Sequence, residues 1–480
     1  MVKEITLFFK RKFEKFNYKN ISYVLICFCF LALSMLFGEV NNSHNSGAFG
    51  TNFSLAGTII FYLILLLNFA LILYIGKINN ILKFNKGVII FIFIGVLTTF
   101  YMIGVDFGTD YTRLFNNNSI TLLDKFKSIM DVSLSIMMGF VLIYLIPPFK
   151  EKDLAIRIFC FIFVGFSLVM IIYSLITEMD IYIAFIKNPT FFTKYDSGNV
   201  NAIWCVSFFK YGNVYGHVLF LLCLVILLLS VSYNRRFIFL FSFIVGIFIL
   251  FSGSRTAFFG FFTLMVSYGV VFLISLYKAN KIYFYILLFF FIFLIVFGIF
   301  EIFVFKLFTI REVITKSDGS KEVINYTLFD LLKKYFSYVD SRIDIYRSVR
   351  TRFIWSDYIF GIGYNMNDLL SRTFDGSFFN YHNGFLEVYT TGGIYLSIIY
   401  ILLIVYIFHI NNKLFARPDR YKYYLYVITI PYLIYQLGEA FPILYNVFGG
   451  GVTAIMFIMV PFNKVREVNE ICNINKLFIK

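Results

Sequence analysis

Long apolar stretches separated by shorter polar segments dominate the pattern of this chain. A helix that crosses a bilayer needs roughly 20 consecutive apolar residues. Stretches approaching this length lie at 21–38, 56–76, 87–105, 128–147, 154–176, 214–232, 237–251, 256–277, 282–308, 391–408, 423–437 and 448–462. The pattern therefore predicts an all-α integral membrane protein with about twelve transmembrane helices.

One polar segment, at residues 309–385, is much longer than the others. Its stretch Tyr326–Trp355 has no Pro or Gly and shows apolar residues at roughly helical spacing, which predicts an amphipathic helix near the outer membrane interface. The Gly-Ile-Gly at 361–363 should end that helix. We divide the chain into an N-terminal transmembrane bundle of about nine spans (1–308), a long outer, periplasmic loop (309–390), and about three C-terminal spans with a cytoplasmic tail (391–480).

The charges fit this interpretation. The chain is 60% hydrophobic and 14% charged, whereas soluble domains carry about 25% charged residues. Its net charge of +15 could indicate nucleic acid, but Lys and Arg concentrate in alternate segments between the spans, while the segments 39–55 and 438–447 have none. Because cytoplasmic loops are the basic ones, both termini are predicted to be cytoplasmic, and no nucleic acid partner is needed.

The cysteines and acidic residues give no sign of a metal centre. The six cysteines are dispersed, without the paired spacing of a zinc site. No acidic metal motif is found on the cytoplasmic side, and no Gly-rich phosphate-binding loop is convincing. We expect neither a metal nor a cofactor.

The turn at 252–255, Ser-Gly-Ser-Arg, separates two predicted spans on the outer face. An Arg on that face runs against the positive-inside tendency, so Arg255 needs an explanation. The guanidinium could reach lipid headgroups, or its planar fork of donors could bind phosphate oxygens. This motif alone leaves both interpretations open.

A second basic group lies within the predicted amphipathic helix. Arg342, Tyr346 and Arg350 follow one another at intervals of four residues and so share one side of a helix. That side could present cations to a lipid pyrophosphate. It could equally be a solvated face on which Asp340 and Asp344 balance the charge.

The motif Tyr-His-Asn-Gly-Phe-Leu-Glu at 381–387 precedes the next span. A loop histidine is often structural, but with a pKa near 6.5 in water His382 is the side chain suited to proton transfer near neutral pH. Glu387 could orient such a base or contact a sugar, or it could serve as a helix cap or interfacial group.

These motifs occur in one order along the chain. Ser-Gly-Ser-Arg-Thr-Ala begins a span, Arg342 and Tyr346 lie in the long loop, Phe-Gly-Ile-Gly follows at 360–363, then His-Asn-Gly-Phe-Leu-Glu at 382–387 and Gly-Gly at 392–393. In this order the chain resembles the superfamily of O-antigen ligases and O-antigen polymerases, and the resemblance spans roughly residues 200–410.

The resemblance implies a GT-C-like fold and a metal-independent, inverting membrane glycosyltransferase that takes glycan from an undecaprenyl pyrophosphate carrier. It implies that Arg255 and Arg342 bind the pyrophosphate and that His382 activates or positions the acceptor hydroxyl. Tyr346, Arg350, Asn383 and Glu387 are the further substrate-binding candidates.

Three functions are compatible with the sequence. The preferred one is a polymerase of O-antigen or capsule that transfers glycan to a lipid-linked repeat unit on the outer face of the bacterial inner membrane. A ligase that transfers glycan to lipid A core uses the same donor chemistry. A lipid-linked oligosaccharide flippase is disfavoured, because we find no internal repeat of the kind common in transporters. A polymerase would have a chain-length regulator and a flippase as partners, besides the bilayer and the lipid-linked glycan.

Overall fold

The computed structural model describes residues 86–110, 122, 125, 152–187, 205, 207, 212–233, 236–300, 309–315, 321–327, 330, 351, 353–363, 383–415 and 424–438. The longer helices among them are α4 (Lys86–Gly108), α7 (Lys152–Thr177), α9 (Gly212–Ser232), α10 (Phe241–Phe251), α11 (Arg255–Ala279), α12 (Lys281–Phe300), α17 (Gly384–Phe415) and α18 (Tyr424–Gln436). The short ones are α8 (Met179–Lys187), the 3-10 helix η2 (Arg236–Leu240) and α15 (Trp355–Phe360).

Eight of the predicted spans coincide with these helices, where η2 and α10 together make up the span at 237–251. The other four, at 21–38, 56–76, 128–147 and 448–462, lie outside the described residues. Within the described part of the chain, Arg255–Lys278 and Gly384–Leu402 have the length and apolar composition of a membrane span. The protein is thus mostly helical, and the total of twelve spans stays a prediction.

Two helices show where the interior and the periphery lie. Side chains from Val218 to Leu229 of α9 are buried all round the helix, which packs against α7, α10 and α11. Helix α12 instead exposes large apolar side chains on most of its surface, for example Ile282 at 71% and Phe289 at 73%. An apolar surface of this extent is suited to lipid rather than water.

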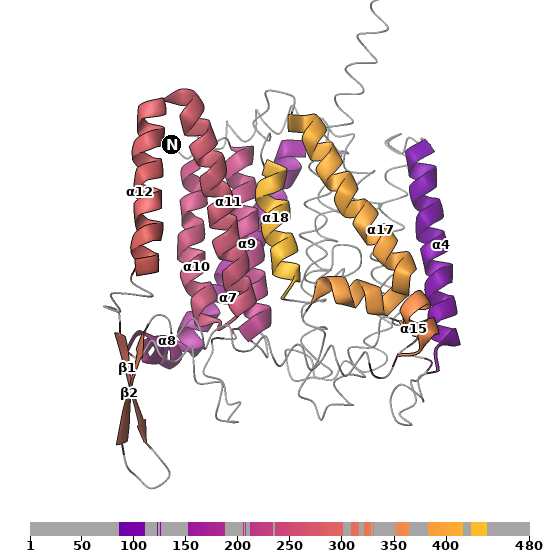
Figure 1. The fold of residues 1–480 in the computed structure, drawn as a ribbon, viewed down its shortest axis with the longest axis horizontal. Helices are drawn as coiled ribbons and strands as arrows, with labels where there is room; N and C mark the ends of the chain where they lie inside the picture. Colours follow the sequence, from indigo (N-terminus) through magenta and orange to yellow (C-terminus); the bar gives the residue numbers. More distant parts are fainter. Residues whose placement is uncertain are drawn as a thin grey trace, which may run out of the picture.

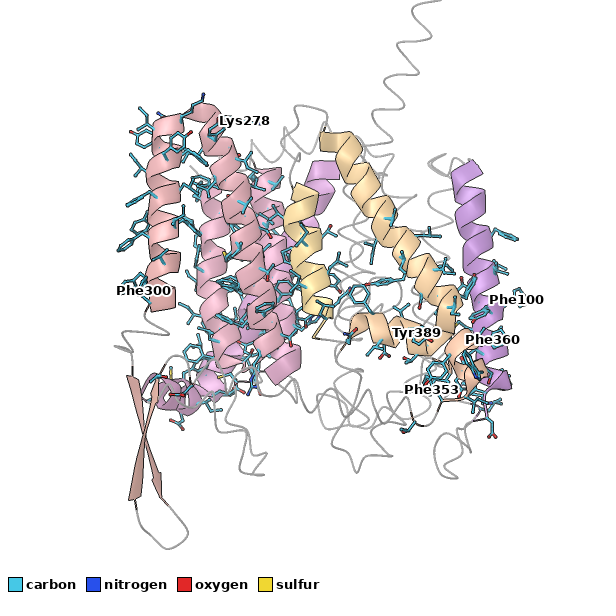
Figure 2. The ribbon with its side chains drawn as sticks, viewed as in Figure 1. Phe100, Lys278, Phe300, Phe353, Phe360 and Tyr389 are labelled. Atoms are coloured by element: carbon cyan, nitrogen blue, oxygen red, sulfur yellow. The ribbon has the colours of Figure 1, made fainter. Side chains whose placement is uncertain are left out.

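Two of the short helices and the β-hairpin lie at one end of the molecule. In Figure 1, α8, the two-stranded hairpin, α15 and the first part of α17 lie at the same end, and α18 stands between α11 and α17. Figure 2 places Lys278 at the opposite end from Phe353, Phe360 and Tyr389. We refer to the end with α15 and the hairpin as the loop end. The sequence predicts that this end is the outer one.

The long loop contains an element that the all-α prediction missed. Strands β1 (Thr309–Thr315) and β2 (Lys321–Thr327) pair antiparallel, with Thr309 opposite Thr327 and Val313 opposite Val323. Both strands are rich in β-branched residues, which favour extended backbone, and Asp-Gly at 318–319 is a turn signal between them. The amphipathic helix therefore does not begin at Tyr326, which pairs with Ile310 in the sheet.

A helix start does follow the hairpin directly. The Asp330 carboxylate accepts hydrogen bonds from Thr327 N at 2.9 Å and Thr327 Oγ1 at 2.6 Å, and Asp330 N donates to Thr327 Oγ1 at 3.2 Å. This reciprocal pairing is the capping box that begins many helices. Residues 331–350, which make up most of the predicted amphipathic helix, lie outside the described residues. Helix α15 is a separate helix that begins after Ile354, whose backbone is extended (φ −99°, ψ 171°), and ends at Gly361. The Gly-Ile-Gly motif therefore ends this short helix and not the predicted amphipathic helix, which does not continue through Ile354.

Candidate functional site

The Ser-Gly-Ser-Arg motif forms a tight turn between α10 and α11 at the loop end. Ser252 Oγ donates to Ile249 O at 2.7 Å and accepts from Ser254 N at 3.2 Å. Ser254 is the N-cap of α11 and accepts from Ala257 N at 3.4 Å. Gly253 adopts φ +66°, which a glycine reaches without steric cost. The turn places Arg255 as the first residue of α11.

A buried carboxylate supports the loop beside this turn. Both oxygens of Glu178 accept from Ser207 N, at 3.1 and 3.2 Å, and Oε2 also accepts from Ser174 Oγ. Two residues before Ser207, Cys205 N donates to Phe251 O at 3.1 Å, at the end of α10. Cys205 and Ser207 thus link the α7–α8 region to the turn before Arg255. Glu178 was not among the predicted site residues; its signal in the sequence is an acidic residue directly after a long apolar stretch, followed by Asp180.

The His-Asn-Gly motif forms the start of α17. Asn383 Oδ1 accepts from Phe385 N and Leu386 N, both at 3.0 Å, which makes Asn383 the N-cap. Its Nδ2 donates to Leu437 O at 3.3 Å. Both ends of this side chain therefore bind protein groups, so its predicted contact with substrate stays a prediction. Glu387 lies in the first turn of α17 and is 2% exposed, inside the protein rather than on its surface.

The N-termini of α11 and α17 meet at the C-terminal end of α18. Thr256 Oγ1 donates to Gly438 O at 3.4 Å, next to the Leu437 carbonyl that Asn383 binds. Two motifs that are 128 positions apart in sequence, at Arg255 and Asn383, are thereby held on consecutive carbonyls of one turn. The structure therefore brings the start of α11, where Arg255 lies, close to the start of α17, which Asn383 caps.

The remaining predicted site residues cannot be placed in this arrangement. Arg342, Tyr346, Arg350 and His382 lie outside the described residues. The roles of these four residues stay predictions.

The two glycine motifs pack against each other. Helix α17 is kinked at Gly392 and Gly393, and Gly393 has φ +57°. Ile362 N donates to Thr390 O at 2.8 Å, and Gly363 N donates to Thr391 O at 3.0 Å. The Gly-Ile-Gly segment thus donates to the last carbonyls before the kink, and the first part of α17 runs across the loop end (Figure 1).

Helix α4 also contacts the place where residues 361–363 pack against the kink of α17, which we name the glycine junction. The hydroxyl of Tyr101 donates to Phe360 O at 2.8 Å and to Gly392 O at 3.1 Å. The Tyr101 ring lies 4.4 Å from that of Tyr395, whose hydroxyl is 3.2 Å from Thr98 Oγ1. The start of α17 is therefore fixed at both of its ends, at Asn383 by α18 and at the kink by α15 and α4.

The arrangement is suited to an anion. The N-terminus of a helix carries partial positive charge, which favours a nearby anion, although the caps Ser254 and Asn383 already bind several of the N–H groups here. Arg255 adds a full positive charge at the start of α11. Among the described residues, no group of three or more His, Cys, Asp or Glu side chains could hold a metal ion.

Apolar helices with lipid-suited surfaces and a polar site at one end define a helical membrane protein. The comparison with protein families specifies the class further. Residues 240–401, about a third of the chain, match the family model described as O-antigen ligase. The match runs from the start of α10 to the second part of α17 and confirms the resemblance to the O-antigen ligase and polymerase superfamily. Members of this family are glycosyltransferase-like enzymes of polysaccharide biosynthesis. Neither the search of curated proteins nor that of solved structures gave a match.

Proposed function

We propose that this protein is a polysaccharide polymerase that transfers glycan from an undecaprenyl pyrophosphate carrier to a lipid-linked repeat unit on the outer face of the inner membrane. The observation that supports it is the meeting of the Arg255 turn and the His-Asn-Gly motif on the last turn of α18. The donor's pyrophosphate would bind at the start of α11, and the acceptor hydroxyl would approach from the side of His382.

The chemistry explains why cations are needed at this position. The acceptor oxygen forms a bond to the anomeric carbon of the donor sugar while the bond from that carbon to the pyrophosphate oxygen breaks. Negative charge therefore develops on the leaving group, where a fixed guanidinium lowers the barrier more than it stabilises the bound donor. Attack from the face opposite the leaving group gives inversion, and the hydroxyl proton passes to a base, the role proposed for His382.

A ligase remains the second candidate, since the matching family model is described as O-antigen ligase. Both reactions use the same donor and differ in the acceptor, which is lipid A core for a ligase. Arg255 and Arg342 would have the same role in either reaction. Only the product distinguishes them.

The first experiment replaces Arg255 with Ala and measures both surface glycan and lipid-linked glycan in a strain deleted for the gene. Loss of one electrostatic group of this kind typically costs about 10² to 10³ in rate, so polymer should be absent although the variant is in the membrane. Lipid A core with single repeat units would indicate a polymerase. Accumulated long lipid-linked chains would indicate a ligase.

Lys278→Ala is a matched control, because it removes a cation from the other end of the same helix (Figure 2). This variant should make normal polymer. Normal polymer from a membrane-inserted Arg255→Ala variant would refute the proposed function.

A further inference from the structure

Four consecutive residues at the end of α18, Tyr435 to Gly438, bind side chains from the helices that build the site. The carbonyls of Leu437 and Gly438 accept from Asn383 and Thr256, as described above. Gln436 accepts from the hydroxyl of Tyr400 on the second part of α17. This segment, which we name the α18 turn, therefore contacts α11 and both parts of α17.

The fourth position connects the α18 turn to the buried core. The hydroxyl of Tyr435 and Nδ1 of His217 share a hydrogen bond of 2.7 Å, and their rings stack with centroids 5.2 Å apart. Tyr435 also stacks on Phe220, at 4.9 Å between centroids. Both His217 and Tyr435 are completely buried. His217 lies on α9, whose side chains from Val218 to Leu229 are buried on all sides.

The position of His217 on α9 links it to the Arg255 turn as well. A Cβ at the neighbouring Gly216 would lie against Ser254 and, at 2.6 Å, against Ser252 Oγ. The start of α9 is thus in close contact with the turn on one side and with Tyr435 on the other. The start of α9 therefore supports both the Arg255 turn and the α18 turn, which also contact each other directly through Thr256 and Gly438.

We propose that His217 is a positioning residue of the donor site: through its hydrogen bond with Tyr435 it fixes the α18 turn, which in turn sets the spacing of the α11 and α17 N-termini. This inference rests on the proposed function. His217 is buried away from the loop surface and does not itself touch the donor. Its contribution comes from geometry, because reacting groups displaced by about 1 Å can lose on the order of a hundredfold in rate.

The test compares His217→Phe, Tyr435→Phe and the double variant, in purified protein supplied with an undecaprenyl pyrophosphate-linked repeat unit. Phe at 217 keeps an aromatic ring against Tyr435 but removes the hydrogen bond, and Phe at 435 removes only the hydroxyl. Each single variant should lower kcat about tenfold, with a smaller change in KM, because the Arg255 contact strengthens as charge develops on the leaving group. The double variant should lose no more than either single one, since each substitution breaks the same bond.

A conservative variant and a remote control separate positioning from stability. The amide of Asn can occupy the place of Nδ1, so His217→Asn should recover part of the kcat that His217→Phe loses. Tyr268→Phe removes a hydroxyl from α11, from a ring that packs on Phe239 of η2, and should leave kcat unchanged.

The two proposals fail in different ways. If the single variants lower only the amount of folded protein and keep kcat per folded molecule, or if the double variant loses the product of both single effects, the positioning role of His217 is wrong. Those results would leave the proposed function intact as long as Arg255→Ala is inactive. Activity of Arg255→Ala would instead overturn the function on which the inference depends.

Discussion

The bundle of α9, α10 and α11 and the junction of α15 with α17 both rely on glycine, but in different ways. In the bundle, a Cβ at Gly216, Gly246 or Gly260 would meet the side chains of Ser254, Phe261 and Phe220, respectively. At the junction, a Cβ at Gly361 would meet backbone atoms, with Thr391 O at 2.5 Å and the amide nitrogens of Gly392 and Gly393 at 2.6 Å.

The difference matters because side chains and backbone respond differently when an added methyl group crowds them. A crowded side chain can move to another rotamer or tilt, at a cost of about 1 to 3 kcal/mol for an overpacked core. Backbone engaged in hydrogen bonds cannot move without breaking them, and here Ile362 and Gly363 both donate to α17. The bundle should therefore tolerate small changes, whereas the junction should not.

The largest effect is expected for Gly393→Ala at the junction. A Cβ there would lie against the carbonyl of Ile359, and the backbone of the residue (φ +57°, ψ −147°) lies in a region that costs a non-glycine residue about 1–3 kcal/mol even without a clash. We expect a loss of at least about 2 kcal/mol, seen as a lower melting temperature in detergent and little protein in the membrane. Gly104→Ala in α4 is the control, since no atom lies within 4 Å of the added Cβ. Equal stability of the two variants would contradict the contrast drawn between side-chain and backbone contacts.

An intermediate effect is expected for Gly216→Ala in the bundle. The new methyl group would press on Ser252 Oγ, which can rotate, and on Ser254 Cβ, which moves only with the backbone of the turn, while α9 gains about 1 kcal/mol of helix propensity. Overpacking costs about 1 to 3 kcal/mol, so stability should fall by no more than about 2 kcal/mol. Activity should fall about tenfold, because the displaced turn leads directly into Arg255. The measurements are the melting temperature and transfer from the lipid-linked donor, with Gly165→Ala on α7 as a control that has open space. Full activity would show that the turn can yield without moving Arg255.

The smallest effect is expected for Tyr101→Phe, which removes two hydrogen bonds from α4 to the junction but keeps the ring contact with Tyr395. Hydrogen bonds of this kind contribute about 1 kcal/mol, so the melting temperature should fall by only a few degrees. Tyr283→Phe on α12, whose side chain is 61% exposed, should have no effect. A loss as large as that of Gly393→Ala would mean that Tyr101, rather than the glycine contacts, holds the junction together.

The sequence by itself determined the helices and the motifs. Runs of apolar residues identify spans because lipid offers no partner for backbone groups, which forces helices of membrane length. Eight of the predicted spans therefore coincide with described helices. The Ser-Gly-Ser-Arg turn and a helix stop at Gly361 could be predicted for similar local reasons, since caps and glycine conformations depend on neighbouring residues. The helix that stops there is the short α15, which was not predicted. The β-hairpin was missed, although its β-branched residues and its Asp-Gly turn were visible in the sequence.

Only the tertiary structure decided which of these motifs belong together. Nothing near Leu437 or Gly438 in sequence indicates that their carbonyls would bind Asn383 and Thr256. His217 and Glu178 likewise bind groups from distant segments, Tyr435 and Ser207, which no local sequence pattern indicates. The physical reason is that helix formation follows from local periodicity, whereas the pairing of buried polar groups depends on which helices become neighbours, and that is set by packing across the whole chain.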